Sequence, residues 1–137
     1  MAHAIKQILP GESLIYFGDT AHLPYGDKSA ESIRYYSNRI TEFLLEHNSK
    51  VVLVACNTAS ASAYDSLKND FQGKIILIDV IDPVVDYLST RRFNKVGVIG
   101  TKRTISSGTY EKKINEKSPA TTVVSMIFII LPLMLKI

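Results

Sequence analysis

The sequence predicts an α/β fold, an open, mostly parallel sheet with helices on both faces. Short, β-branched apolar runs alternate along the chain with stretches of helical spacing, which is the pattern of strand–helix units. The apolar runs are continuous, as in strands buried on both faces of a parallel sheet. With 137 residues, 46% apolar and 21% charged, the chain is long enough for one domain with a hydrophobic core.

Four apolar runs bounded by polar residues or glycine are the expected strands. They cover residues 13–19, 50–56, 74–80 and 95–101. Consecutive parallel strands are joined by right-handed crossovers that contain a helix. No internal repeat, low-complexity tract or linker interrupts the alternation. We therefore expect these runs to share one open sheet.

Five stretches between and around these runs are the expected helices. They cover residues 2–9, 29–48, 58–70, 83–91 and 105–117. In residues 29–48, apolar side chains recur at helical spacing and form one buried stripe, and Ser29 can cap the start. We expect Asn57 or Thr58 to cap the next helix, and Pro83 suits the first turn of the one after it.

The end of the chain departs from this pattern. Residues 123–137 read VVSMIFIILPLMLKI, with Lys136 as the only charge. The stretch is shorter than the ~20 residues of a membrane-spanning helix, and Pro132 interrupts it, so we expect no membrane attachment. A buried strand followed by a loop is one interpretation, and a non-native tail is the other. We divide the chain into an α/β domain over residues 1–119 and an apolar tail over residues 120–137.

Composition excludes several classes of function. The net charge of +3 comes from scattered basic residues without interleaved aromatic side chains, so we expect no nucleic-acid partner. One cysteine excludes an internal disulfide framework and a cysteine-rich zinc site, and it favours a reducing, cytoplasmic location. The start lacks the layout of a signal peptide. The loops contain neither metal-ligand spacing nor a nucleotide-binding glycine motif, so we expect no metal and no cofactor.

The only cysteine, Cys56, ends the apolar run over residues 50–56 and precedes a predicted helix. In open α/β sheets, ligands bind beyond the carboxyl ends of the strands. Backbone N–H groups and the helix dipole stabilise a thiolate at such a place, and Asn57 and Thr58 can hold an anionic group there. From position alone, Cys56 is either a reactive thiol or a small buried hydrophobic residue.

A long loop, GDTAHLPYGDKS (residues 18–29), leaves the first expected strand at the same edge. Long loops at strand ends often carry function. A turn at its Pro-Tyr-Gly sequence can present backbone N–H groups and the phenol of Tyr25 to a ligand, or can be an ordinary surface turn. We expect His22 in this loop to be a surface residue.

The loop GTKRTISSGTY (residues 100–110) leaves the last expected strand in the same way. Thr101 and Thr104 can bind an anion or cap the following helix, and capping is the ordinary role of such hydroxyls. The three loops together predict a site at one edge of the sheet.

Three motifs in combination resemble those of bacterial glutamate racemases. They are YFGDTAHLPYGDKS (16–29), VLVACNTASA (52–61) and VGVIGTKRTISSGTY (96–110), in the order and spacing of that family. The resemblance covers about residues 5–117. It implies a fold of two similar α/β domains with the active site between them. It also implies cofactor-independent interconversion of L- and D-glutamate, which supplies D-glutamate for peptidoglycan.

The resemblance assigns roles to five residues. Cys56 is implied as one of two acid/base groups that flank the substrate Cα, because racemisation removes a proton on one face and returns it on the other. Tyr25, Gly26, Asn57 and Thr58 are implied to bind glutamate. The resemblance leaves a homodimer open.

The sequence departs from the family in three ways. The family's first strand with its Asp-Ser-Gly motif has no counterpart, there is no second cysteine, and no acidic residue follows Glu116. We therefore predict an incomplete N-terminal racemase domain, inactive as a racemase by itself. A related aspartate or hydantoin racemase, and a non-catalytic α/β protein that binds an amino acid, are the alternatives.

Overall fold

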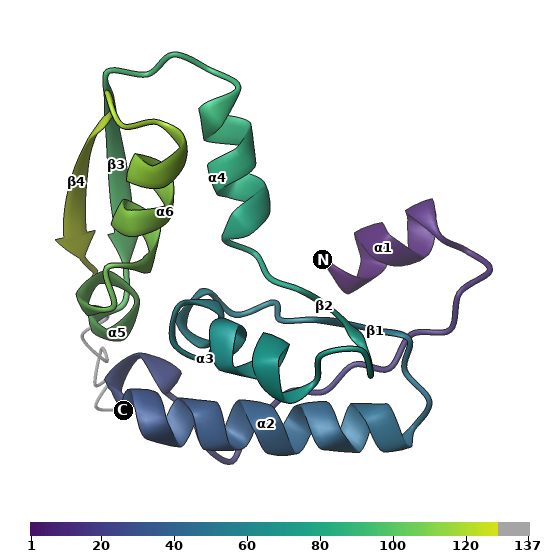
Figure 1. Cartoon of the computed structure of the whole chain (residues 1–137). Helices are drawn as coiled ribbons and strands as arrows, with labels where there is room; N and C mark the ends of the chain where they lie inside the picture. Colours follow the sequence, from purple (N-terminus) through teal and green to yellow (C-terminus); the bar gives the residue numbers. More distant parts are fainter. Residues whose placement is uncertain (129–137) are drawn as a thin grey trace, which may run out of the picture.

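The computed structural model describes residues 1–128, and its elements form two packed units, with the first helix extending away from both (Figure 1). The first helix is α1 (Ala2–Ile8). The lower unit in Figure 1 contains η1 (Tyr25–Asp27), α2 (Ala30–Glu46), β1 (Val51–Leu53), α3 (Asn57–Asp70) and β2 (Ile76–Ile78). The upper unit contains α4 (Asp82–Ser89), β3 (Lys95–Gly100), α5 (Lys102–Ser106), α6 (Thr109–Lys117) and β4 (Thr122–Ile127).

The strands form two parallel pairs. β1 pairs with β2 from Val51↔Ile76 to Leu53↔Ile78. β3 pairs with β4 from Lys95↔Thr122 to Gly100↔Ile127. Each pair is parallel, with helices along the connecting chain, so the predicted α/β class is confirmed. Within residues 1–128 the two pairs are not joined into one sheet.

The strand predicted over residues 13–19 is not formed, and every residue from 13 to 18 is exposed. A strand needs a hydrogen-bonded neighbour, because each extended residue carries an N–H and a C=O to satisfy. Among the described residues, no backbone hydrogen bond joins 13–17 to another strand. The apolar composition of this run therefore favours a strand, but no strand among the described residues pairs with it.

The helices largely follow the sequence, with shifted ends. Ser29 caps α2 as predicted, because its Oγ accepts the N–H of Ser32 at 3.1 Å. Pro83 lies in the first turn of α4. The helix predicted over 105–117 is wrong, because Gly108 adopts φ +66° and separates α5 from α6. None of the helices within residues 1–128 is both long and apolar enough to cross a membrane.

Each unit has its own hydrophobic cluster. In the lower unit, Ile33 of α2 packs with three residues of α3 and the residue that follows that helix: Ala59, Ala63, Leu67 and Phe71. In the upper unit, Ile81 and Val85 pack with Ile114 of α6, against half-buried residues of β3. The two clusters share no residue, so the chain contains two small cores.

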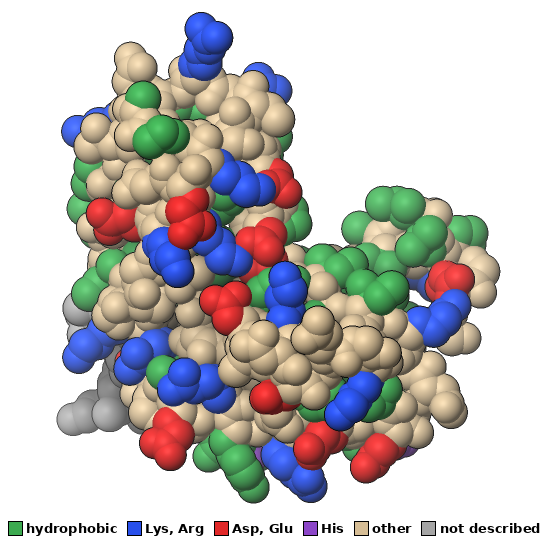
Figure 2. Space-filling model, in the orientation of Figure 1, with side chains coloured by type: hydrophobic (Ala, Val, Ile, Leu, Met, Phe, Trp, Pro, Cys, Tyr) green, Lys and Arg blue, Asp and Glu red, His purple; other side chains and the backbone are tan. Residues whose placement is uncertain are grey.

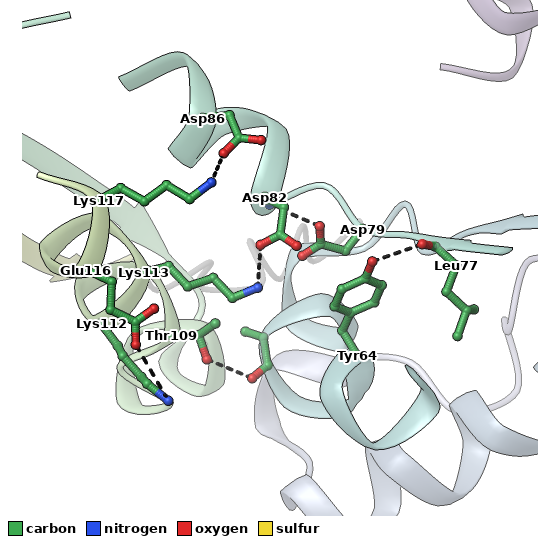
Figure 3. Close-up of polar contacts among 11 residues, drawn as sticks. Tyr64, Leu77, Asp79, Asp82, Asp86, Thr109, Lys112, Lys113, Glu116 and Lys117 are labelled. Atoms are coloured by element: carbon green, nitrogen blue, oxygen red, sulfur yellow. Dashed lines mark hydrogen bonds and ion pairs between the residues drawn. The ribbon is translucent and has the colours of Figure 1, made fainter. Parts of the chain in front are cut away.

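Polar contacts connect the end of β2 to α4, and α4 to α6 (Figure 3). Asp79 is 1% exposed, and its Oδ1 accepts the N–H of Asp82 at 3.0 Å. Lys113 and Lys117 of α6 form ion pairs with Asp82 and Asp86 of α4. Both pairs have i, i+4 spacing, so they lie one turn apart on facing helices.

The predicted division at residue 119 stays a prediction. β4 lies beyond that boundary and pairs with β3 over all six of its residues. Residues 129–137, which include Pro132 of the predicted tail, lie outside the described residues.

Candidate active site

Cys56 connects β1 to α3 and occupies the N-cap position of that helix. Its backbone is extended (φ −113°, ψ 121°), and its carbonyl oxygen accepts the N–H of Ser60 at 2.8 Å. The predicted capping of α3 by Asn57 or Thr58 is therefore wrong, because the helix begins one residue earlier than expected. The thiol is exposed, and in the described part of the chain it makes no capping hydrogen bond. Cys56 is thus not a buried filler, and its thiol can reach a bound molecule.

Three threonine hydroxyls meet beside the start of α3. The Oγ1 atom of Thr58 lies 3.0 Å from that of Thr101 and 3.1 Å from that of Thr104. Thr58 and Thr104 are buried, whereas Thr101 is exposed. Thr101 caps α5 by accepting the N–H of Thr104 at 3.2 Å, which is the predicted capping role. This cluster joins the start of α3 to the start of α5, although their residues are more than forty positions apart.

Asp19 holds the phenol of Tyr25. The Tyr25 hydroxyl donates to Asp19 Oδ2 at 2.6 Å, and His22 Nδ1 lies 2.7 Å from Asp19 Oδ1. Burial and the bond to the carboxylate raise the pKa of Tyr25, so the phenol stays a donor at neutral pH. Burial raises the pKa of Asp19, but the hydrogen bonds from Tyr25 and His22 outweigh it, and the net pKa is lowered.

Gly26 brings the Tyr25 loop against α5. The loop enters η1 after a cis Leu23–Pro24 peptide bond, so the predicted turn is present. A Cβ on Gly26 would lie 2.8 Å from Cβ of Thr101, closer than carbon atoms approach in proteins. The Thr101 hydroxyl is bonded to its neighbours in the threonine cluster, so this side chain cannot easily move away. The close approach therefore requires glycine at position 26.

Asn57 faces α6. Its Oδ1 accepts the hydroxyl of Tyr110 at 2.6 Å. Burial, together with the charge of Asp79, raises the pKa of Tyr110, so this phenol also stays a donor. A hollow of about 360 Å³ lies between the units, and Asn57, Thr58 and Tyr110 line it with apolar residues of α4 and β3. Its size falls in the range of small-molecule sites.

The structure brings most of the predicted site residues together. Gly26 and Thr58 both meet Thr101. Cys56 lies two positions before Thr58 at the start of α3 and, after burial and Asp19, also contributes to the raised pKa of Tyr25. Within residues 1–128, no three His, Cys, Asp or Glu side chains form a group that could hold a metal ion.

The sequence did not single out Asp19 or Tyr110. Asp19 could have been found from the sequence, because it is an acidic residue in the same long loop, six positions before Tyr25. Tyr110 is 53 positions from Asn57, and no spacing rule relates the two. His22 is 41% exposed, as predicted for a surface residue, yet it is bonded to Asp19 and stacked on Tyr36 at 3.9 Å.

These features define a class of protein: an α/β unit with an exposed thiol at a helix start, next to hydrogen-bond donors that include the Asn57 amide nitrogen. A thiol in such a place can take up or release a proton, and the donors can hold a carboxylate and stabilise charge that develops on it. Such an arrangement suits acid–base chemistry at a carbon atom that carries a carboxylate group.

Comparisons with known proteins agree with that class. No protein-family model matches the chain. The glutamate racemase of Neisseria meningitidis serogroup C is 41% identical over 121 residues, and that of Limosilactobacillus reuteri is 40% identical over 121 residues. These matches cover 88% of this chain, and 44% and 45% of the two relatives.

Solved structures give the same result. Glutamate racemase from Francisella tularensis, in complex with D-glutamate, matches with a TM-score of 0.85 and 38% identity, over 92% of this chain and 47% of that one. Glutamate racemase from Aquifex pyrophilus matches with a TM-score of 0.87 and 35% identity, over 96% of this chain and 52% of that one. The chain spans about half the length of the relatives it matches. The resemblance to glutamate racemases that the motifs predicted is confirmed in both sequence and fold.

Proposed function

We propose that this chain is part of a glutamate racemase, which interconverts L- and D-glutamate without a cofactor. The observation that carries the proposal is the exposed Cys56 thiol at the N-cap of α3, two positions before Thr58 of the threonine cluster. The sequence likeness to enzymes of that name supports it over most of the chain.

In this proposal, Cys56 is the catalytic residue on one face of the substrate Cα. Its thiolate removes the Cα proton from one enantiomer, and its thiol returns a proton to form that enantiomer again. Racemisation needs a second acid/base group on the opposite face. Because the chain contains one cysteine, a second thiol must come from outside it.

The remaining site residues hold the substrate. The N–H groups around Gly26 present donors from the loop after residue 18, and the Tyr25 hydroxyl, which donates its proton to Asp19, offers its oxygen to the substrate ammonium group. The amide nitrogen of Asn57 is available for a carboxylate, since the oxygen of that side chain is bonded to Tyr110. Thr58 keeps the exposed hydroxyl of Thr101 in position. Donors to the substrate carboxylate also stabilise the negative charge that develops on deprotonation.

The same proposal gives the chain a cellular role. The whole enzyme would act in the cytoplasm and supply D-glutamate for peptidoglycan, and hence for cell-wall biogenesis and cell shape. We also propose a homodimer as its assembly.

The test is solvent exchange at Cα. The purified chain is incubated in D₂O with L- or D-glutamate, and deuterium at Cα is measured by proton NMR beside a chiral assay for the opposite enantiomer. We expect deuterium incorporation without racemisation, and its loss in Cys56→Ser. Ser62→Ala in α3 serves as the matched control.

The other outcomes separate the alternatives. Glutamate binding in calorimetry without exchange at Cα would replace the proposal with a non-catalytic amino-acid-binding protein. Faster exchange with aspartate would assign a related racemase. Formation of the opposite enantiomer by the pure chain would overturn the prediction that it is inactive alone.

A further inference from the structure

A second hollow, of about 400 Å³, lies between η1 and α5. Three basic side chains line it: Lys28 from the Tyr25 loop, and Lys102 and Arg103 from α5. The hydroxyls of Ser29 and Ser106 and a single carboxylate, Asp27, complete its polar lining. Apart from Gly26, this lining is separate from the residues around Cys56.

The basic groups of this hollow are not neutralised by carboxylates. Elsewhere among residues 1–128, lysine, arginine and histidine form six ion pairs, but none involves Lys28, Lys102 or Arg103. Asp27 also lacks an ion-pair partner in this part of the chain, so the lining carries three positive charges against one negative charge. Like charges that are brought together repel, and a bound anion removes that repulsion.

Arg103 is held in place by the opposite wall. Its Nε donates to the carbonyl oxygen of Lys28 at 3.2 Å, a contact between residues 75 positions apart. This bond leaves the two terminal nitrogens of the guanidinium for a ligand. Paired guanidinium N–H groups match the spacing of phosphate oxygens, and ammonium groups of lysine add point charges.

We propose that the hollow between η1 and α5 binds the phosphate group of a small anionic ligand. Its volume exceeds that of an inorganic phosphate and fits a diphosphate or an organic phosphate. The ligand would bridge Lys28 to Arg103 and hold η1 against α5. The inference does not depend on the proposed function, because Lys28, Lys102 and Arg103 carry it; of the proposed glutamate-binding residues, Gly26 alone borders the hollow.

The test is calorimetry of the full chain with sodium pyrophosphate at constant ionic strength, in unmodified protein and in charge-removing variants. We expect saturable binding that Lys102→Gln and Arg103→Gln each weaken about tenfold, as loss of one charge-assisted contact predicts. Arg92→Gln is the matched control, since Arg92 is exposed in the loop between α4 and β3, whereas α5 follows the other end of β3. Arg103→Gln also removes the hydrogen bond from Arg103 to the Lys28 carbonyl oxygen. Lys102 is exposed, so Lys102→Gln removes a charge and leaves that bond in place.

Four results would overturn the proposal. One is the absence of saturable binding, and another is equal weakening in Arg92→Gln. The third is displacement of pyrophosphate by glutamate, which would place the anion in the Cys56 site. Citrate in place of pyrophosphate tests the chemistry, and equal affinity for citrate would contradict a preference for phosphate. Saturable binding of pyrophosphate to a chain that shows no exchange at glutamate Cα would support this inference and reject the proposed function.

Discussion

The side chains around Cys56 are positioned by hydrogen bonds that do not involve the thiol. Asp19 holds Tyr25, and Tyr110 holds Asn57. The thiol itself is exposed, so it is the group in this site that is left to react. At the scale of the residue, hydrogen bonds hold Tyr25 and Asn57 in place, whereas the thiol of Cys56 stays exposed.

The bond between Tyr25 and Asp19 predicts a pH effect. Tyr25→Phe removes the donor to the carboxylate, so the pKa of Asp19 should rise toward its ordinary value. A carboxyl whose folded-state pKa is lowered stabilises the fold above its unfolded pKa, and this contribution disappears as the pH falls through the folded pKa. Below about pH 4, the variant should therefore lose less stability than the unmodified chain. NMR titration of the Asp19 carboxyl measures the shift, and an unchanged titration would contradict the prediction.

Gly26 gives a steric prediction. A methyl group at this position would overlap Thr101, so Gly26→Ala should destabilise the chain by about 1–3 kcal/mol, as overpacking does. Gly97→Ala is the matched control, because a Cβ at Gly97 meets nothing within 4 Å. Urea unfolding compares the two variants. Equal free energies of unfolding would mean that the Tyr25 loop is not packed against Thr101.

At the scale of the element, the threonine cluster ties α3 to the start of α5. Its hydroxyls satisfy one another in a buried place, and no charged group is needed to join the two units there. The ion pairs between α4 and α6 lie nearer the surface, and such pairs add little to stability. The cluster therefore connects the two units, whereas these ion pairs join two helices of the upper unit.

This difference can be measured. Thr58→Val leaves the hydroxyl of Thr104 with one partner fewer in a buried place, so it should cost about 1–3 kcal/mol of unfolding free energy. In the double variant with Thr104→Val, the two costs should not add, because both remove the same contact. Thr20→Val, at an exposed position, is the control and should stay within about 0.5 kcal/mol. Additive costs in the double variant would argue against a shared cluster.

At the scale of the whole molecule, the chain exposes much apolar surface. Its accessible surface is 9870 Å², whereas a compact protein of 15.2 kDa has about 7100 Å². Several large apolar side chains are exposed on residues 13–17 and on both strand pairs, and on the face in Figure 2 green side chains also reach the surface around α1. Exposed strand edges and apolar faces favour association.

We therefore predict that the chain associates with itself as its concentration rises. Ile99 of β3 and Met126 of β4 are register partners, and they are 70% and 64% exposed. Replacing both with lysine should shift sedimentation velocity toward the monomer, because charge opposes contact between apolar faces. A monomeric unmodified chain with a cooperative thermal transition at ordinary temperature would contradict this prediction.

Local sequence was enough to predict the strand–helix alternation, the cap at Ser29 and the place of Cys56. Each depends on residues within one or two turns of chain, where propensity, capping and polarity act directly. The motifs around Tyr25, Cys56 and Thr101 also predicted the likeness to glutamate racemases, which the comparisons confirm.

Contacts between distant residues were decided by the tertiary structure. Residues 13–17 have strand composition but no strand, because pairing needs a neighbour that local sequence does not supply. Thr58 was expected to cap a helix, and instead its hydroxyl meets Thr101 and Thr104 across more than forty positions. Sequence by itself thus determined which groups stand at the strand ends. Only folding decided which of them touch, because hydrogen-bond partners in a packed site are chosen by proximity in space.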